Sequence, residues 1–190
     1  MKNDDYDLCI TDDLLVFNAR MRGIPSLAFT DDDLSVTKLF SIVLSLATRV
    51  IAPEITNLGR FNSKKIGFNG YKELAYLHPN HFSPDRTVIK KYNMEEGNYV
   101  LIRLVSLKAY HDIGKRGISY TQLAELIKLL EKHYRIYITS ESKLPEEFHK
   151  YQLKINVSDI AHIIANAELF IGDSQTMTSE SAVLGTPAFR

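Results

Sequence analysis

The 190-residue sequence contains a single cysteine, Cys9, and no tryptophan. One cysteine excludes an internal disulfide and any zinc site built from several cysteines, and it suits a reducing compartment. The chain also lacks an excess of either charge, because Lys and Arg together number 23 and so do Asp and Glu. Without an overall basic field, binding to nucleic acid is not indicated.

The sequence has no hydrophobic run of the roughly 20 residues that a membrane-spanning helix requires. Its most apolar stretch, residues 39–52, is interrupted by Arg49. We interpret this stretch as a core-facing helix that runs into a strand, and a weakly membrane-associating surface is the less favoured interpretation. The first seven residues are too acidic and polar for a signal peptide. We therefore expect a cytoplasmic protein, with peripheral membrane contact left open.

Both Gly-rich phosphate fingerprints, G-x-G-x-x-G and G-x-x-x-x-G-K-[ST], are absent from the sequence. The histidines show no metal-ligand spacing, so neither a metal nor a cofactor is predicted. One acidic run, Asp31, Asp32 and Asp33, contains a carboxylate pair suited to a divalent cation held against a nucleotide diphosphate. A helix start that collects acidic residues is the interpretation we favour.

What the sequence does contain is an alternation of short apolar runs and helical stretches. Strands are predicted at residues 6–10, 24–29 and 50–52, with helices over 11–22 and 34–48 between them. After a polar region, strands follow at 99–105 and 135–139, and a capping box formed by Ser119 and Gln122 opens a helix to residue 133. This order predicts an α/β protein with parallel strands. Residues 1–68 would form the end of one domain, 69–96 the crossing, and 97–190 most of a second domain.

Residues 168–190 predict a strand, a tight turn, a helix and another strand. Ser174 is a suitable N-cap before a helix over residues 177–184, Gly185 suits the helix end, and Pro187 blocks its continuation. In a parallel sheet, such a turn directs free backbone N–H groups and the positive helix end toward a ligand, which is typically a phosphate. Most capped turns of this kind bind nothing, and that interpretation stays open.

A polar loop follows the strand that ends at residue 105. A loop at the carboxyl end of a strand is where open α/β sheets bind ligands. His111 and Asp112 could act there as an acid/base pair, since histidine titrates nearest neutrality. A solvated loop without function is at least as well supported by the sequence. The polar residues of interest in this loop are Ser106, Lys108, His111, Asp112, Lys115 and Arg116.

Three segments, residues 69–79, 103–112 and 172–187, resemble motifs that occur in the same order in one prokaryotic family. That family is catalogued as a domain of unknown function and assigned to the GT-B, glycosyltransferase-like superfamily. The last motif is more distantly similar to that of UDP-N-acetylglucosamine 2-epimerase and of the lipid-linked N-acetylglucosaminyltransferase of cell-wall synthesis. In the epimerase, a Ser-Gly-Gly turn holds the diphosphate and a later Glu binds the ribose. Ser174 and Glu180 match these positions, whereas Gln175 and Thr176 replace the glycines. The epimerase's His-Arg phrase is absent, so epimerase chemistry is not supported.

The resemblance implies a GT-B-like protein with two Rossmann-like units that binds a sugar nucleotide, with a UDP-sugar favoured and an unknown acceptor. It places the diphosphate over Ser174, Gln175 and Thr176 and the ribose against Glu180. Across the cleft, Ser106, Lys108, Lys115 and Arg116 would face the phosphates, with His111 as a weaker acid/base candidate and no metal required. The alternative is a non-catalytic nucleotide-binding or scaffold module.

GT-B domains contain roughly 150 residues or more each, so we expect a fragment truncated at both ends. Such a fragment should show no transferase turnover. Its exposed sheet edges would favour dimerisation.

Overall fold

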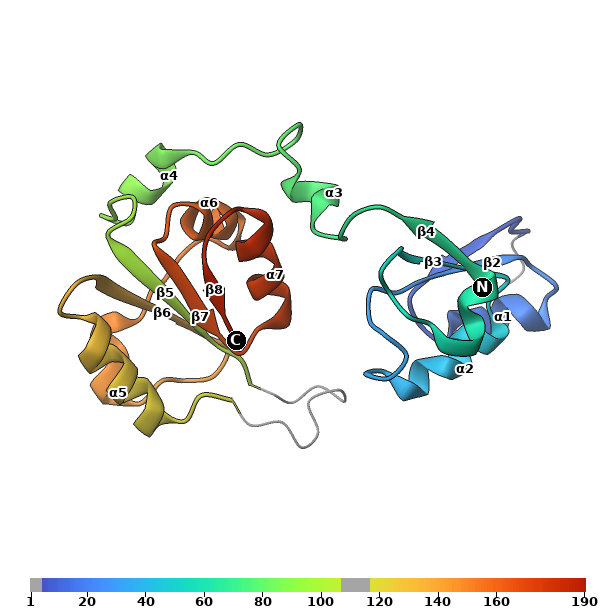
Figure 1. Ribbon diagram of the computed structural model, residues 1–190, viewed down its shortest axis with the longest axis horizontal. Helices are drawn as coiled ribbons and strands as arrows, with labels where there is room; N and C mark the ends of the chain where they lie inside the picture. Colours follow the sequence, from blue (N-terminus) through green and yellow to red (C-terminus); the bar gives the residue numbers. More distant parts are fainter. Residues whose placement is uncertain (1–4, 107–116) are drawn as a thin grey trace. The chain divides into compact units, whose positions relative to one another are not determined.

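The computed structural model describes residues 5–106 and 117–190, and the chain divides into two compact units, Met1–Leu74 and Ala75–Arg190. Each unit contains one four-stranded sheet whose strands all run parallel (Figure 1). The predicted α/β class with two Rossmann-like sheets is therefore confirmed. In the described residues, no helix is long and apolar enough to cross a membrane.

The sheet of the first unit has its strands in sequence order, β1-β2-β3-β4. Its core lies on one face, where two helices and a 3₁₀ turn cover the strands. Cys9, in β1, is only 5% exposed. The opposite face carries Ile10, Phe29 and Ile66, which are 60%, 41% and 49% exposed. The elements are β1 (Cys9–Thr11), α1 (Leu15–Met21), β2 (Ser26–Phe29), η1 (Lys38–Phe40), α2 (Ser41–Leu46), β3 (Arg49–Pro53), η2 (Gly59–Lys64) and β4 (Lys65–Phe68).

The acidic run at residues 31–33 does not begin a helix, so that prediction is wrong. The next helical residues start only at Lys38, and the run makes tertiary contacts instead. The Asp33 Oδ1 atom accepts a hydrogen bond from the Asn57 backbone N at 2.6 Å, and Asp31 pairs with the Lys72 Nζ atom at 2.6 Å. Among the described residues there is no group of three or more acidic, His or Cys side chains that could hold a metal.

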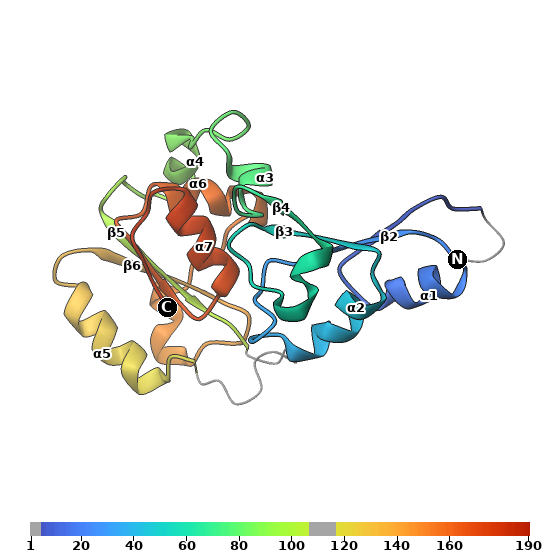
Figure 2. The same ribbon diagram turned by 45° about the vertical axis from the view of Figure 1, so that its right-hand side comes forward.

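The second unit has the strand order β6-β5-β7-β8, in which β5 and β7 are the central strands. Helix α5 packs on one face, whereas α4, α6 and α7 pack on the other, so the sheet is covered on both sides (Figures 1 and 2). The elements are α4 (Arg86–Lys90), β5 (Tyr99–Leu104), α5 (Tyr120–Leu130), β6 (Arg135–Ser140), η4 (Glu146–Tyr151), η5 (Val157–Asp159), α6 (Ile160–Ala165), β7 (Leu169–Gly172), α7 (Gln175–Val183) and β8 (Ala188–Phe189). A short helix, α3 (Leu74–Leu77), lies at the boundary between the two units.

Local capping signals account for two of these helix starts. The predicted capping box is present: the Gln122 backbone N donates to the Ser119 Oγ atom at 3.3 Å, and the Ser119 N donates to the Gln122 Oε1 atom at 3.0 Å. Helix α4 was not predicted, although Asp85 caps it by accepting a hydrogen bond from the Thr87 N at 2.8 Å. Such caps satisfy the first N–H groups of a helix, which have no partner within it.

The strand order creates a topological switch point in the second sheet. The chain leaves β5 toward α5 on one face, and it leaves β7 toward α7 on the opposite face. Because these connections diverge, a crevice opens at the carboxyl ends of the two neighbouring strands. Ligands of open α/β sheets bind in such crevices.

Candidate functional site

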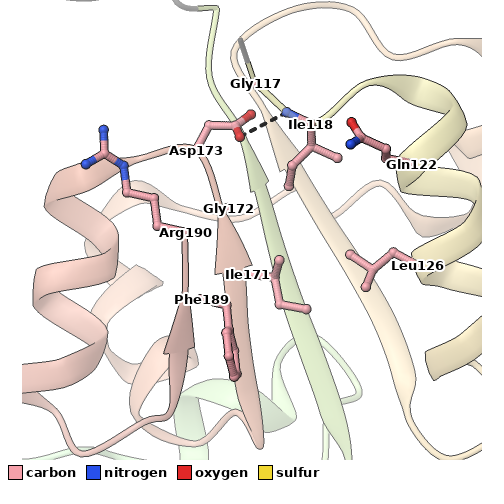
Figure 3. Close-up of a pocket in the computed structure, with 9 residues that line it drawn as sticks. All are labelled: Gly117, Ile118, Gln122, Leu126, Ile171, Gly172, Asp173, Phe189 and Arg190. Carbon is pink, nitrogen blue, oxygen red and sulfur yellow. Dashed lines mark hydrogen bonds between the residues drawn. The ribbon is translucent and has the colours of Figure 1, made fainter. Parts of the chain in front are cut away.

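A hollow of about 430 Å³ lies at this switch point (Figure 3). Its volume falls within the roughly 300–1,000 Å³ typical of small-molecule sites. The Ile118 backbone N donates a hydrogen bond to the Asp173 Oδ1 atom at 3.1 Å, which ties the segment before α5 to the tip of β7. The lining residues come from α5 and the segment before it, from the end of β7, and from the end of β8: Gly117, Ile118, Gln122, Leu126, Ile171, Gly172, Asp173, Phe189 and Arg190.

Three of the predicted site residues lie together at the start of α7. Ser174 is the N-cap, and its Oγ atom accepts a hydrogen bond from the Met177 N at 3.3 Å. Gln175 and Thr176 form the exposed first turn, where the N–H groups and the helix dipole give a positive local potential. Beside them, the Arg190 Nη1 atom donates to the Gln175 Oε1 atom at 3.2 Å. The predicted N-cap at Ser174 is therefore confirmed, and the helix begins two residues earlier than predicted.

Glu180 lies further along the same helix and is half-buried. Its Oε1 atom accepts a hydrogen bond from the Tyr76 hydroxyl group at 2.8 Å. The sequence placed Tyr76 in a polar crossing segment and gave it no role. Because the two residues are 104 positions apart in the sequence, no local sequence pattern could predict this hydrogen bond.

The loop after β5 is described only at its two ends. Ser106 donates its backbone N–H to the Glu141 Oε2 atom at 3.0 Å, while the Arg103 Nη2 atom pairs with the Glu141 Oε1 atom at 2.8 Å. The buried Arg103 Nε atom has no hydrogen-bond partner among the described residues. The sequence analysis gave no role to Arg103 or Arg190, although Arg103 is the penultimate residue of β5 and Arg190 directly follows β8. The other predicted loop residues lie outside the described residues: Lys108, His111, Asp112, Lys115 and Arg116.

Glu141 should make the stability of the protein depend on pH. The Ser106 N–H and then the Arg103 guanidinium group hydrogen-bond its charged form, which lowers the pKa of this carboxyl below its ordinary value of 4.5. A lowered pKa adds stability that is fully present above the unfolded-state pKa and is lost as the pH falls through the folded-state pKa. Below about pH 4.3, we expect the free energy of unfolding to fall more steeply for the wild type than for Glu141→Gln. Denaturant titrations across pH would measure this, and parallel pH profiles for the two proteins would contradict it.

Residues 17–190 match the family described as "Protein of unknown function (DUF354)". The chain belongs to this family. This confirms the resemblance that the three motifs indicated. No curated protein sequence matches the chain.

Among solved structures, this DUF354 chain is similar to UDP-N-acetylglucosamine 2-epimerase from Rickettsia bellii, with a TM-score of 0.64 and 18% sequence identity. The match covers 100% of the DUF354 chain and 56% of the epimerase chain, so the chain spans a little over half the length of that structure. Similarity at this level of identity shows the fold, and it confirms the GT-B-like class.

Proposed function

We propose that this DUF354 protein binds a sugar nucleotide, with a UDP-sugar favoured, and that it belongs functionally with the glycosyltransferases or their relatives. One observation carries the proposal. A helix of nine residues, α7, begins at the switch point of a parallel sheet with Ser174 as its cap, and the same helix holds the carboxylate of Glu180. The fold shared with a structure titled as a UDP-sugar epimerase supports the choice of ligand class.

In this proposal, the first turn of α7 binds the diphosphate. The backbone N–H groups near Ser174, Gln175 and Thr176 and the positive helix end would stabilise its negative charge. Arg190 supplies a cation beside this turn, where it already donates to Gln175. A leaving diphosphate can be stabilised by such groups without a metal ion. The acceptor of the sugar is unknown.

The second part of the proposal concerns the ribose. A carboxylate such as that of Glu180 can accept hydrogen bonds from two vicinal hydroxyl groups, which ribose offers and deoxyribose does not. Ser106 begins the loop that would face the nucleotide from β5. Lys108, Lys115, Arg116 and the acid/base candidate His111 belong to this proposal as residues of that same loop.

A non-catalytic nucleotide-binding or scaffold module is the second candidate. It is favoured by Gln175 and Thr176, because side chains at these positions replace the two glycines that let a phosphate approach the backbone closely in the epimerase motif. The first candidate predicts transfer of the sugar, whereas neither a nucleotide-binding module nor a scaffold module does. Release of UDP during incubation with UDP-N-acetylglucosamine would support the first candidate over the second.

Nucleotide binding can be tested by a thermal-shift panel of UDP, UDP-N-acetylglucosamine, GDP, GDP-mannose and inorganic phosphate. A ligand that binds the folded state at 100 times its Kd stabilises it by about 2.7 kcal/mol, which raises the Tm by several degrees. We expect the uridine diphosphate compounds to raise the Tm and the guanosine compounds to have little effect. A panel without any shift at millimolar ligand would contradict the proposal.

A further inference from the structure

The motif at residues 69–79 has no role in the function proposed above, yet it supplies a hydrogen-bond partner of Glu180. Within this motif, α3 presents Tyr76, whose side chain is 48% exposed. Its hydroxyl group donates to the Glu180 Oε1 atom at 2.8 Å. The next residue, Leu77, is only 4% exposed, so α3 is held by an apolar anchor beside Tyr76.

The chain after α3 is fastened to α6 in the same unit. The Phe82 ring packs against the His162 ring of α6, with a centroid separation of 4.8 Å. The Asp85 backbone N then donates to the His162 Nδ1 atom at 3.0 Å. A tight turn lies between these anchors and α3, in which the carbonyl oxygen of His78 accepts from the N–H groups of His81 and Phe82. These contacts fasten the segment that follows α3 to α6.

We propose that Tyr76 is a positioning residue that sets the Glu180 carboxylate for the ribose, an inference that rests on the sugar-nucleotide function proposed above. The hydroxyl group of Tyr76 fixes one carboxylate oxygen and so restricts the rotamers of the Glu180 side chain before the ligand arrives. Less conformational entropy is then lost when the ligand binds. A carboxylate can accept about four hydrogen bonds, so one bond from Tyr76 and bonds from two ribose hydroxyl groups are compatible in number.

The test is calorimetric titration of UDP, dUDP and pyrophosphate against wild type and Tyr76→Phe. Phenylalanine keeps the ring and removes the donor. We expect UDP affinity to fall about 3- to 10-fold, in line with the worth of one hydrogen bond. The affinity for dUDP should change much less because dUDP lacks one of the two vicinal hydroxyl groups, and pyrophosphate affinity should not change. The preference for UDP over dUDP should therefore narrow in the variant.

Tyr71→Phe is a matched control, since Tyr71 lies in the same motif and is 54% exposed. It should leave all three affinities unchanged. A wild type that prefers UDP over dUDP, together with a Tyr76→Phe variant that keeps the same preference, would overturn the role of Tyr76 while the proposed function stands. Tighter UDP binding by the variant would also overturn it, because Tyr76 would then compete with the ligand. Failure of the wild type to bind UDP would overturn the proposed function itself, and with it this inference.

Discussion

Replacing Glu180 by glutamine is expected to weaken UDP binding by about 1.5–3 kcal/mol, the worth of a hydrogen bond to a charged group. That is a loss of roughly 10- to 150-fold in affinity. The change removes the charge and one acceptor oxygen, while the remaining amide oxygen can still accept from Tyr76. We therefore expect the free energy of unfolding to change by less than about 0.5 kcal/mol, as for most substitutions away from the core.

Isothermal titration calorimetry of UDP and of pyrophosphate would measure the effect of Glu180→Gln. Pyrophosphate should bind both proteins alike, since its contacts belong to the first turn of α7. Glu125→Gln on α5 makes the same chemical change at an exposed position and serves as the matched control. Equal UDP affinity for wild type and Glu180→Gln would remove Glu180 from the proposed site.

Replacing Gly172 by alanine is expected to have the largest effect on stability. Gly172 ends β7 against Arg103 of β5, and a Cβ atom at this position would lie 2.5 Å from the Arg103 carbonyl oxygen and 2.9 Å from its Cβ atom. Backbone atoms within a sheet cannot move aside as a flexible side chain can. The strands would therefore have to separate, at a cost of about 1–3 kcal/mol or more. Chemical denaturation should show this loss in the transition of the second unit.

Gly67→Ala is the matched control in the first unit. A Cβ atom there would lie 2.9 Å from the Glu54 Cγ atom, which belongs to a flexible side chain and can rotate away. We expect this substitution to cost well under 1 kcal/mol. If Gly172→Ala and Gly67→Ala lowered the free energy of unfolding equally, the close approach of β7 to β5 would not be the cause of the stability loss in Gly172→Ala.

The parts of the fold that depend on neighbouring residues were predictable from the sequence. The box at Ser119 and Gln122 and the N-cap at Ser174 act within three residues of the helix start, so their signals are visible in the chain itself. Gly185, with φ +83°, ends α7 where a left-handed residue is required. At these positions the local chemistry and the final structure agree.

The parts that depend on distant residues were not predictable. The acidic run at residues 31–33 has the composition of a helix start, but Asn57 and Lys72 provide partners that outweigh this preference. Strand β4 (Lys65–Phe68) was not predicted, because its four residues include a lysine and a glycine and give a weak local strand signal. The order β6-β5-β7-β8, and hence the position of the hollow, follows from crossover connections that no local pattern encodes. The same is true of the pair formed by Tyr76 and Glu180.

Cys9 gives the protein an intrinsic chemical probe of one half of its structure. It is the sole thiol in the sequence, and it is shielded in β1 of the first unit. A thiol-reactive dye can modify it only when β1 opens, because the reacting thiolate must be accessible. The labelling rate of the unaltered protein therefore reports local opening of Met1–Leu74, and it does so without an engineered cysteine or an isotopic label.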